Sequence, residues 1–223
     1  MDKRHKEISI PSLWGLYLAN ARFKWLAISS TLFLAFCIKY ITSALAVVDL
    51  QTGTQLYDPI HALMPPTLDW SNIIFFLTYS SIFMVLIDAI MKSPMQVLRL
   101  FFAIGVMKIL RSFSMFLLPL EPPIGIIALQ DPLVSFATPN HIVALRDLFF
   151  SGHCATMMIL YLVAVSPMVK KWMTFILVIL PILILWQRVH YTIDVVAGLG
   201  IGAAIYFLVK KTIKLRPDSI SAY

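Results

Sequence analysis

The chain has 223 residues, of which 60% are hydrophobic and 13% are charged, and its mean hydropathy is +0.85. A soluble domain of this size could not bury so much apolar surface, so the composition excludes a soluble globular protein and indicates that lipid surrounds most of the chain. The net charge of +7 is attributed to basic cytoplasmic loops and not to nucleic-acid binding. The two cysteines, Cys37 and Cys154, lie in or beside apolar runs and do not suggest a disulfide framework.

The N-terminal stretch MDKRHKEISIPSLWGLYLAN is charged and then amphipathic, and it lacks the small-residue cleavage site of a signal peptide. Residues 8–20 are predicted to form a helix at the membrane interface, with Trp14 and Tyr17 at the level of the headgroups. We therefore expect residues 1–23 to form a cytoplasmic and interfacial segment.

Six apolar runs follow, each long enough to cross a bilayer. A hydrocarbon core of about 30 Å needs roughly 17–25 helical residues. No internal repeat, low-complexity tract or linker separates the runs. The sequence predicts an all-α bundle of six transmembrane helices over residues 24–210, followed by a cytoplasmic tail at 211–223. The predicted spans are residues 24–48, 71–91, 96–118, 149–168, 171–189 and 191–210.

The loop charges predict the orientation of this bundle. The alternate connections are acidic, with only Arg146 and Arg188 as basic residues. Because basic loops stay in the cytoplasm, both termini are expected there and the acidic loops on the opposite face. The basic residues of the other connections are Lys3, Arg4, Lys6, Arg22, Lys24, Lys92, Arg99, Lys170, Lys171, Lys210, Lys211, Lys214 and Arg216.

Two polar motifs open apolar runs on the non-cytoplasmic side. Ser151-Gly152-His153 opens the fourth run, and His190 with Asp194 opens the sixth. Histidine is rare at membrane depth unless it pairs with another group or does chemistry. Since both motifs lie on one side, segments far apart in sequence are expected to bring their polar groups to the same depth.

These residue types fit a reaction at phosphorus. His190 and Asp194 are four residues apart, so a helix places them on one face about 6 Å apart. The carboxylate can then accept the proton of one imidazole nitrogen and leave the other nitrogen free to attack. His153 can protonate a departing oxygen. Ser151 and Gly152 begin a helix whose free N–H groups favour a phosphate.

Two cations in the third run, Lys108 and Arg111, are candidates for binding that phosphate. Each costs about 2.5–3.5 kcal/mol at membrane depth, which a bound anion would explain. Arg111 is suited to bidentate contacts and Lys108 to acting as a point charge. The alternative is that both snorkel to the interface. Asp147 is a further candidate, as a carboxylate that holds Arg146 or a histidine.

These motifs resemble the type 2 phosphatidic acid phosphatase superfamily. The longer strings DLFFSGH and HYTIDVVAG, and Arg-x-x-Ser-Met with a following Leu-Pro at 111–119, resemble its sphingomyelin synthase branch. The resemblance implies that His190 attacks phosphorus, that Asp194 orients it, and that His153 protonates the leaving alcohol. The phosphatases' first motif, a lysine followed seven residues later by Arg-Pro, is absent, and Phe150 replaces their usual proline.

The leading prediction is an integral membrane lipid phosphotransferase that acts through a phosphohistidine on the periplasmic, lumenal or extracellular face. Its donor would be a phospholipid and its acceptor a lipid alcohol, ceramide or diacylglycerol. A hydrolase of phosphatidic acid or an isoprenoid diphosphate is the second hypothesis, and a non-catalytic lipid transporter is the third. No cofactor, metal ion or nucleic acid is expected. A homo-oligomer is compatible with the sequence.

Overall fold

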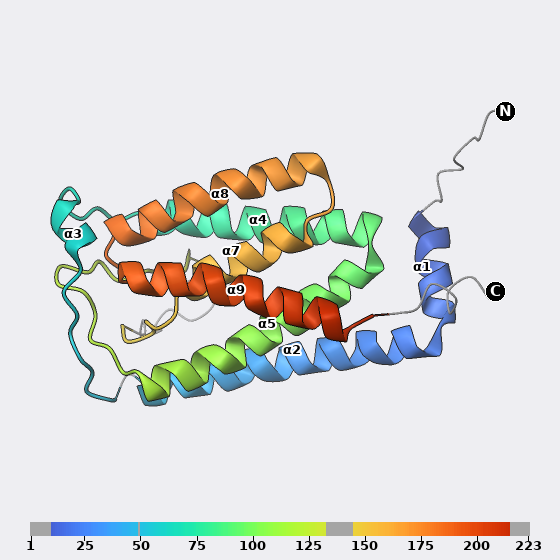
Figure 1. Ribbon diagram of the computed structural model, residues 1–223, viewed down its shortest axis with the longest axis horizontal. Helices are drawn as coiled ribbons and strands as arrows, with labels where there is room; N and C mark the ends of the chain where they lie inside the picture. The colour runs from blue at the N-terminus through green and yellow to red at the C-terminus, as the bar shows by residue number, and fades with distance from the viewer. Residues whose placement is uncertain (1–9, 49, 133–144, 215–223) are drawn as a thin grey trace.

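The computed structural model describes residues 10–48, 50–132 and 145–214, and these residues form helices without any strand. The predicted all-α class is confirmed (Figure 1). The helices are α1 (Ile10–Ala19), α2 (Ala21–Val48), α3 (Pro59–Leu63), α4 (Ser71–Lys92), α5 (Pro94–Leu117), α7 (Gly152–Val163), α8 (Pro167–Trp186) and α9 (Thr192–Thr212).

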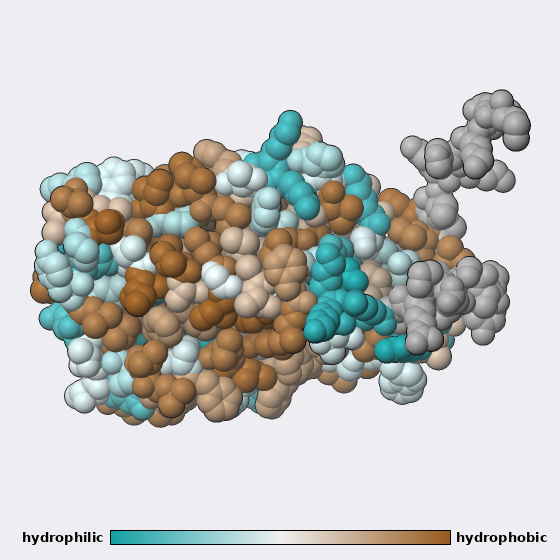
Figure 2. Space-filling view, viewed as in Figure 1, coloured by the Kyte–Doolittle hydropathy of each residue, from teal (hydrophilic) through white to brown (hydrophobic). Residues whose placement is uncertain are grey.

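Five of these helices, α2, α4, α5, α8 and α9, are long and apolar enough to cross a membrane. Each overlaps one of the runs predicted from the sequence. Hydrophobic residues cover most of the visible face of the bundle, and hydrophilic residues gather towards its ends (Figure 2). The chain is therefore a multi-pass membrane protein.

The fourth predicted span, residues 149–168, differs from the prediction. The helix there, α7, has only 12 residues, which rise about 18 Å and fall short of the hydrocarbon core. It packs against α4, α5, α8 and α9, so its apolar residues face protein as well as any lipid. It ends where Asp88 accepts hydrogen bonds from the N–H groups of Val165 and Ser166, just before Pro167 begins α8.

Close helix contacts place α7 directly beside α9. A Cβ at Gly198 would lie 2.6 Å from the carbonyl oxygen of Ser151, and one at Gly202 would lie 2.6 Å from that of Ala155. These two glycines therefore let the backbones approach closely. The beginning of α7 consequently lies against the first turns of α9, which is how the two polar motifs meet.

The interfacial helix expected at residues 8–20 is α1, of which residues 8 and 9 lie outside the described part. Trp14 packs edge-on against Phe23 at 6.3 Å, and its indole N–H donates to the carbonyl of Ile90 at 2.7 Å. Residues 215–223 of the expected tail also lie outside the described residues. In Figure 1, α1 lies at one end of the bundle and α3 at the other. We call the latter the α3 end; α2, α5 and α8 finish there and α9 begins there.

Candidate active site

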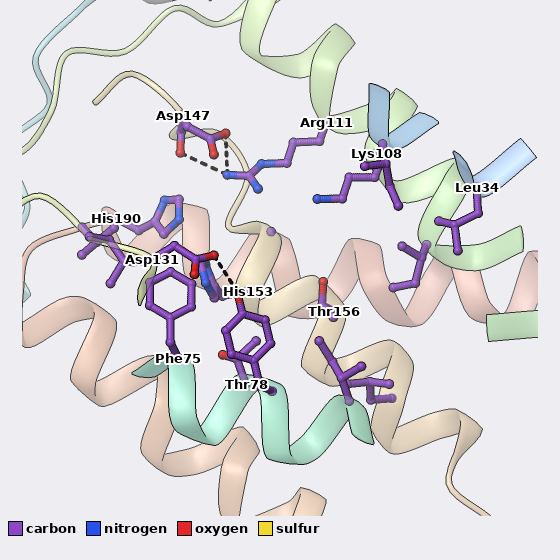
Figure 3. Close-up of a pocket in the computed structure, with 18 of the residues that line it drawn as sticks. Leu34, Phe75, Thr78, Lys108, Arg111, Asp131, Asp147, His153, Thr156 and His190 are labelled. Atoms are coloured by element: carbon purple, nitrogen blue, oxygen red, sulfur yellow. Dashed lines mark hydrogen bonds and ion pairs between the residues drawn. The ribbon is translucent and has the colours of Figure 1, made fainter. Parts of the chain in front are cut away.

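A cavity of about 660 Å³ lies between α2, α4, α5 and α7. Its polar lining includes five of the residues singled out from the sequence, Lys108, Arg111, Asp147, His153 and His190, together with Gly152. Figure 3 shows Lys108 and Arg111 reaching from α5 towards the two histidines. The structure thus gathers side chains from α5, α7 and the α8–α9 turn around one space.

His190 lies in the short turn between α8 and α9, and Asp194 lies in the first turn of α9. The Nδ1 atom of His190 is 3.5 Å from Oδ2 of Asp194, and the two side chains are 2% and 0% exposed. The same Oδ2 accepts a hydrogen bond from the N–H of Tyr191 at 3.0 Å. The carboxylate therefore faces Nδ1, and Nε2 is the nitrogen left for a substrate.

His153 occupies the second position of α7 and also lines the cavity. Its ring meets that of Phe75 edge-on, with centroids 5.7 Å apart. Ser151 caps the helix, since its hydroxyl oxygen accepts from the N–H of Cys154 at 3.4 Å. The N–H of Ser151 donates to the backbone carbonyl of Asp194 at 3.0 Å. This backbone hydrogen bond joins the Ser-Gly-His motif directly to the His-x-x-x-Asp motif.

Arg111 is buried and forms an ion pair with Asp147, with 2.7 Å between Nη2 and Oδ1. The same nitrogen donates to the backbone carbonyl of Asp147 at 3.1 Å. The guanidinium lies over Gly152, where a Cβ would be only 1.8 Å from Nη1. Glycine is therefore required at this position for the arginine to lie over the start of α7.

The expectation that Asp147 holds Arg146 or a histidine was wrong in its choice of partner. Arg146 pairs instead with Glu121, with 3.0 Å between Nη2 and Oε2. The carboxyl of Glu121 also accepts from the N–H of Gly53, and this bond and the Arg146 side chain together lower the pKa of Glu121 below its usual range. Asp147 therefore orients Arg111, one of the two cations that line the cavity.

Lys108 lies almost one turn before Arg111 on α5 and directs its ammonium group into the cavity (Figure 3). Within the described residues, no carboxylate forms a salt bridge with it. A positive charge held in this way favours an anionic ligand.

Sequence reasoning missed two features of this region. The Tyr79 hydroxyl donates to Oδ2 of Asp131 at 2.5 Å, and both residues line the cavity. Asp58, which caps α3 in the loop between α2 and α4, is buried and accepts from the N–H of Thr192 at 2.5 Å. The dipeptide Asp58-Pro59 is a helix-start signal that was present in the sequence, but nothing local to it indicates a partner in α9.

No three His, Cys, Asp or Glu side chains converge as metal ligands in the part of the chain that the structure describes. The site as described consists of two imidazoles, one carboxylate that faces His190, Arg111 with a second carboxylate paired to it, and one cavity-facing lysine. Such a set can bind a phosphate, attack it and move a proton.

Comparison with known proteins agrees with this geometry. Residues 146–212 match the family model described as PAP2 superfamily C-terminal. The matched segment contains α7, α8 and α9, and with them His153, His190 and Asp194; Lys108 and Arg111 lie outside it. A search of curated proteins finds no match. Over residues 146–212, the chain is therefore similar to the PAP2 superfamily C-terminal domain, which is found in sphingomyelin synthase-like proteins.

Proposed function

We propose that this protein is a lipid phosphotransferase that moves the phosphorylated headgroup of a phospholipid to a lipid alcohol, ceramide or diacylglycerol. The observation that carries the proposal is that His190, which Asp194 faces, lines one cavity together with His153 and two cations, and that most other residues lining this cavity are apolar. The family match supports chemistry at a lipid phosphate.

The lining of the cavity has a polar part and an apolar part, as a phospholipid has a polar headgroup and apolar chains. One part carries the histidines and cations, and the other part is apolar. A phosphate bound near Arg111 would leave its hydrocarbon chains in the apolar part, among residues of α2, α4, α5 and α7. The apolar lining residues there are Leu34, Ile38, Ile82, Leu86, Leu100, Phe101, Ile104 and Leu160.

In the first step, Nε2 of His190 attacks the donor's phosphorus. A phosphorus–nitrogen bond forms, and the bond from phosphorus to the diacylglycerol oxygen breaks. Asp194 stabilises the positive charge that develops on the His190 ring. His153 acts as the general acid and gives the departing oxygen the proton that it holds once the anionic phosphate of the donor is bound beside it. Arg111 and Lys108 stabilise the negative charge on the phosphoryl oxygens.

In the second step, His153 accepts the proton of the acceptor hydroxyl. The acceptor oxygen attacks the same phosphorus, the phosphorus–nitrogen bond breaks, and His190 is regenerated. The proton that His153 gave to the first alcohol is thus replaced by that of the second. No cofactor takes part in this sequence.

The charges support a site that opens on the non-cytoplasmic face. Lys92, Lys170, Lys171, Lys210 and Lys211 lie at the end of the bundle opposite α3. The α3 end carries acidic residues, among them Asp58, Asp69 and Glu121. Positively charged ends face the cytoplasm in membrane proteins. The polar half of the cavity lies towards the opposite, α3 end.

The test is headgroup transfer from a labelled phospholipid by the purified full chain, with and without ceramide or diacylglycerol. We expect labelled product only with an acceptor, and a loss of about 10²–10⁴-fold in His190→Ala and in His153→Ala. Retained activity in either variant would refute these roles. Release of water-soluble phosphate without an acceptor would identify a hydrolase instead. Lipid movement undiminished in Asp194→Asn would identify a transporter.

A further inference from the structure

The loop between α2 and α4 is bonded to the turn that carries His190. Its residues 50–70 include α3, and three hydrogen bonds join them to residues 187–191. The N–H of Trp70 donates to Oε1 of Gln187 at 2.8 Å, and the N–H of Leu56 donates to the Tyr191 hydroxyl at 3.2 Å. Nη2 of Arg188 donates to the carbonyl of His61 at 3.4 Å. This loop therefore covers the α8–α9 turn.

A shorter hydrogen bond joins Asp58 of this loop to Thr192, the first residue of α9. Its Oδ2 accepts from the N–H of Thr192 at 2.5 Å, and its Oδ1 accepts from the Thr192 hydroxyl and from the N–H of Ile60, each at 3.0 Å. The residue is 8% exposed. Burial acts to raise the pKa of Asp58, but these hydrogen bonds outweigh it and hold the pKa below its usual range. Asp58 is therefore an ionised, buried carboxylate bonded to the first residue of α9.

The position of His190 depends on this first turn of α9. Nδ1 of His190 faces Asp194 at 3.5 Å and has no hydrogen-bond partner within the described residues. Asp194 is itself held by the N–H of Tyr191. Since Thr192 lies between the two members of the pair, a shift of Thr192 moves both the imidazole and the carboxylate that orients it.

We propose that Asp58 is a positioning residue, whose carboxylate fixes the first turn of α9 and thereby holds the imidazole of His190 in the cavity. Asp58 does not line the cavity and touches no group placed in the reaction. Its effect on turnover rests on the proposed function, whereas its effect on the placement of His190 does not. Loss of the carboxylate is therefore expected to alter the reactivity of His190 and to lower kcat, with little effect on substrate binding.

Asp69 supplies a matched control in the same loop. Its carboxylate accepts from the N–H of Ser71 at 2.9 Å at the start of α4, just as Asp58 accepts from Ile60 at the start of α3. No hydrogen bond from Asp69 to residues 187–192 is present among the described residues. A general weakening of the loop should therefore follow from either substitution, but loss of the bond to α9 should follow only from Asp58→Asn.

The first measurement does not require turnover. Diethyl pyrocarbonate modifies neutral imidazoles, and mass spectrometry gives its rate at each histidine of the full-length chain. His190 is 2% exposed, so we expect slow modification in the unsubstituted protein. Weakening a charge-assisted hydrogen bond should raise the rate at His190 about tenfold in Asp58→Asn. Asp69→Asn should leave the His190 rate within about twofold, a change of under 0.5 kcal/mol.

Equal His190 rates in Asp58→Asn and Asp69→Asn would overturn the proposal. So would an equal increase at His153, because that result would indicate a loosened bundle and not a displaced His190. A selective increase at His190 supports it. If the unsubstituted protein transfers no lipid headgroup, the proposed function fails, and these rates still decide the role of Asp58.

The second measurement is the kinetics of headgroup transfer. We expect Asp58→Asn to lower kcat about tenfold while KM changes by less than about twofold, because only the position of the nucleophile is altered. Asp58→Glu, which keeps the carboxylate, should recover part of the loss, and Asp69→Asn should behave as the unsubstituted protein does. A raised KM with unchanged kcat would contradict a positioning role.

Discussion

The placement of Arg111 over the start of α7 requires a glycine at position 152. A Cβ there would lie 1.8 Å from Nη1, so Gly152→Ala must displace the guanidinium and disturb its 2.7 Å ion pair with Asp147. Charge-assisted hydrogen bonds contribute about 1.5–3 kcal/mol, so we expect headgroup transfer to fall roughly 10- to 100-fold. The measurement is the initial rate of transfer.

Gly200 provides the control for this substitution. It lies in α9, and a Cβ there would have no neighbour within 4 Å. Gly200→Ala should keep the transfer rate of the unsubstituted protein. A full rate in Gly152→Ala as well would show that Arg111 need not lie over the start of α7.

At this scale, local spacing predicted part of the geometry. Asp194 faces His190 because the two residues are four apart, and Ser151 caps the helix in which His153 is the second residue. The partner of Asp147 could not be predicted, because it depends on where α5 passes the segment before α7. Asp58 was missed for the same reason, since its partner Thr192 lies 134 residues away in the chain.

The contact between α7 and α9 sets the distance between the two motifs, and a pair of glycines tests it. Gly202→Ala would place a Cβ 2.6 Å from the carbonyl oxygen of Ala155, whereas Gly200→Ala would place one in open space. Overpacking costs about 1–3 kcal/mol, and alanine at an open helical position is favoured over glycine by about 0.5–1 kcal/mol. We expect thermal unfolding in detergent to show Gly202→Ala destabilised and Gly200→Ala unchanged or stabilised. A reversed order would contradict this packing.

The short helix α3 is expected to loosen on acidification. Burial lowers the pKa of His61, and the nearby Arg188 lowers it further, while Asp58 and Asp194 partly oppose this. A depressed pKa favours the packed form fully above the usual histidine pKa of about 6.5, and this advantage is lost as the pH falls from that value through the depressed pKa. Hydrogen exchange of residues 56–64, corrected for the intrinsic rate, should therefore be faster at about pH 5.5 than at about pH 7.5.

His61→Phe removes the titrating group but keeps a ring beside Tyr191, whose centroid lies 6.1 Å from that of His61. The pH dependence of exchange should disappear in this variant. If it persists unchanged, the titration belongs to another group.

Hydropathy predicted where the long helices lie but not the length of α7. An apolar run indicates burial and does not distinguish lipid from the interior of a bundle. For this reason the sequence predicted a transmembrane helix over residues 149–168, although α7 covers only Gly152–Val163. Its end is set by Asp88, whose bonds to Val165 and Ser166 join positions 77 and 78 residues apart.

For the molecule as a whole, the orientation in the membrane can be measured with introduced cysteines. Cys37 and Cys154 are both buried, so the unsubstituted chain should give little background. Leu63 in α3 and Met168 at the start of α8 are each 82% exposed and lie at opposite ends of the bundle. A membrane-impermeant maleimide should label Leu63→Cys in intact cells and Met168→Cys only after permeabilisation. The opposite pattern would place the polar part of the cavity in the cytoplasm.

The most direct test of the account is to locate the phosphorus during turnover. The full chain is incubated with a phospholipid labelled in its phosphate, without acceptor, quenched in alkali and mapped by mass spectrometry. We predict a labelled headgroup on His190, reduced by about 10²-fold or more in His153→Ala, because the leaving oxygen then lacks its proton donor. Label on another residue would contradict the central claim that both imidazoles act on one phosphorus atom. So would the lack of a labelled histidine in a protein that transfers the headgroup once ceramide or diacylglycerol is added.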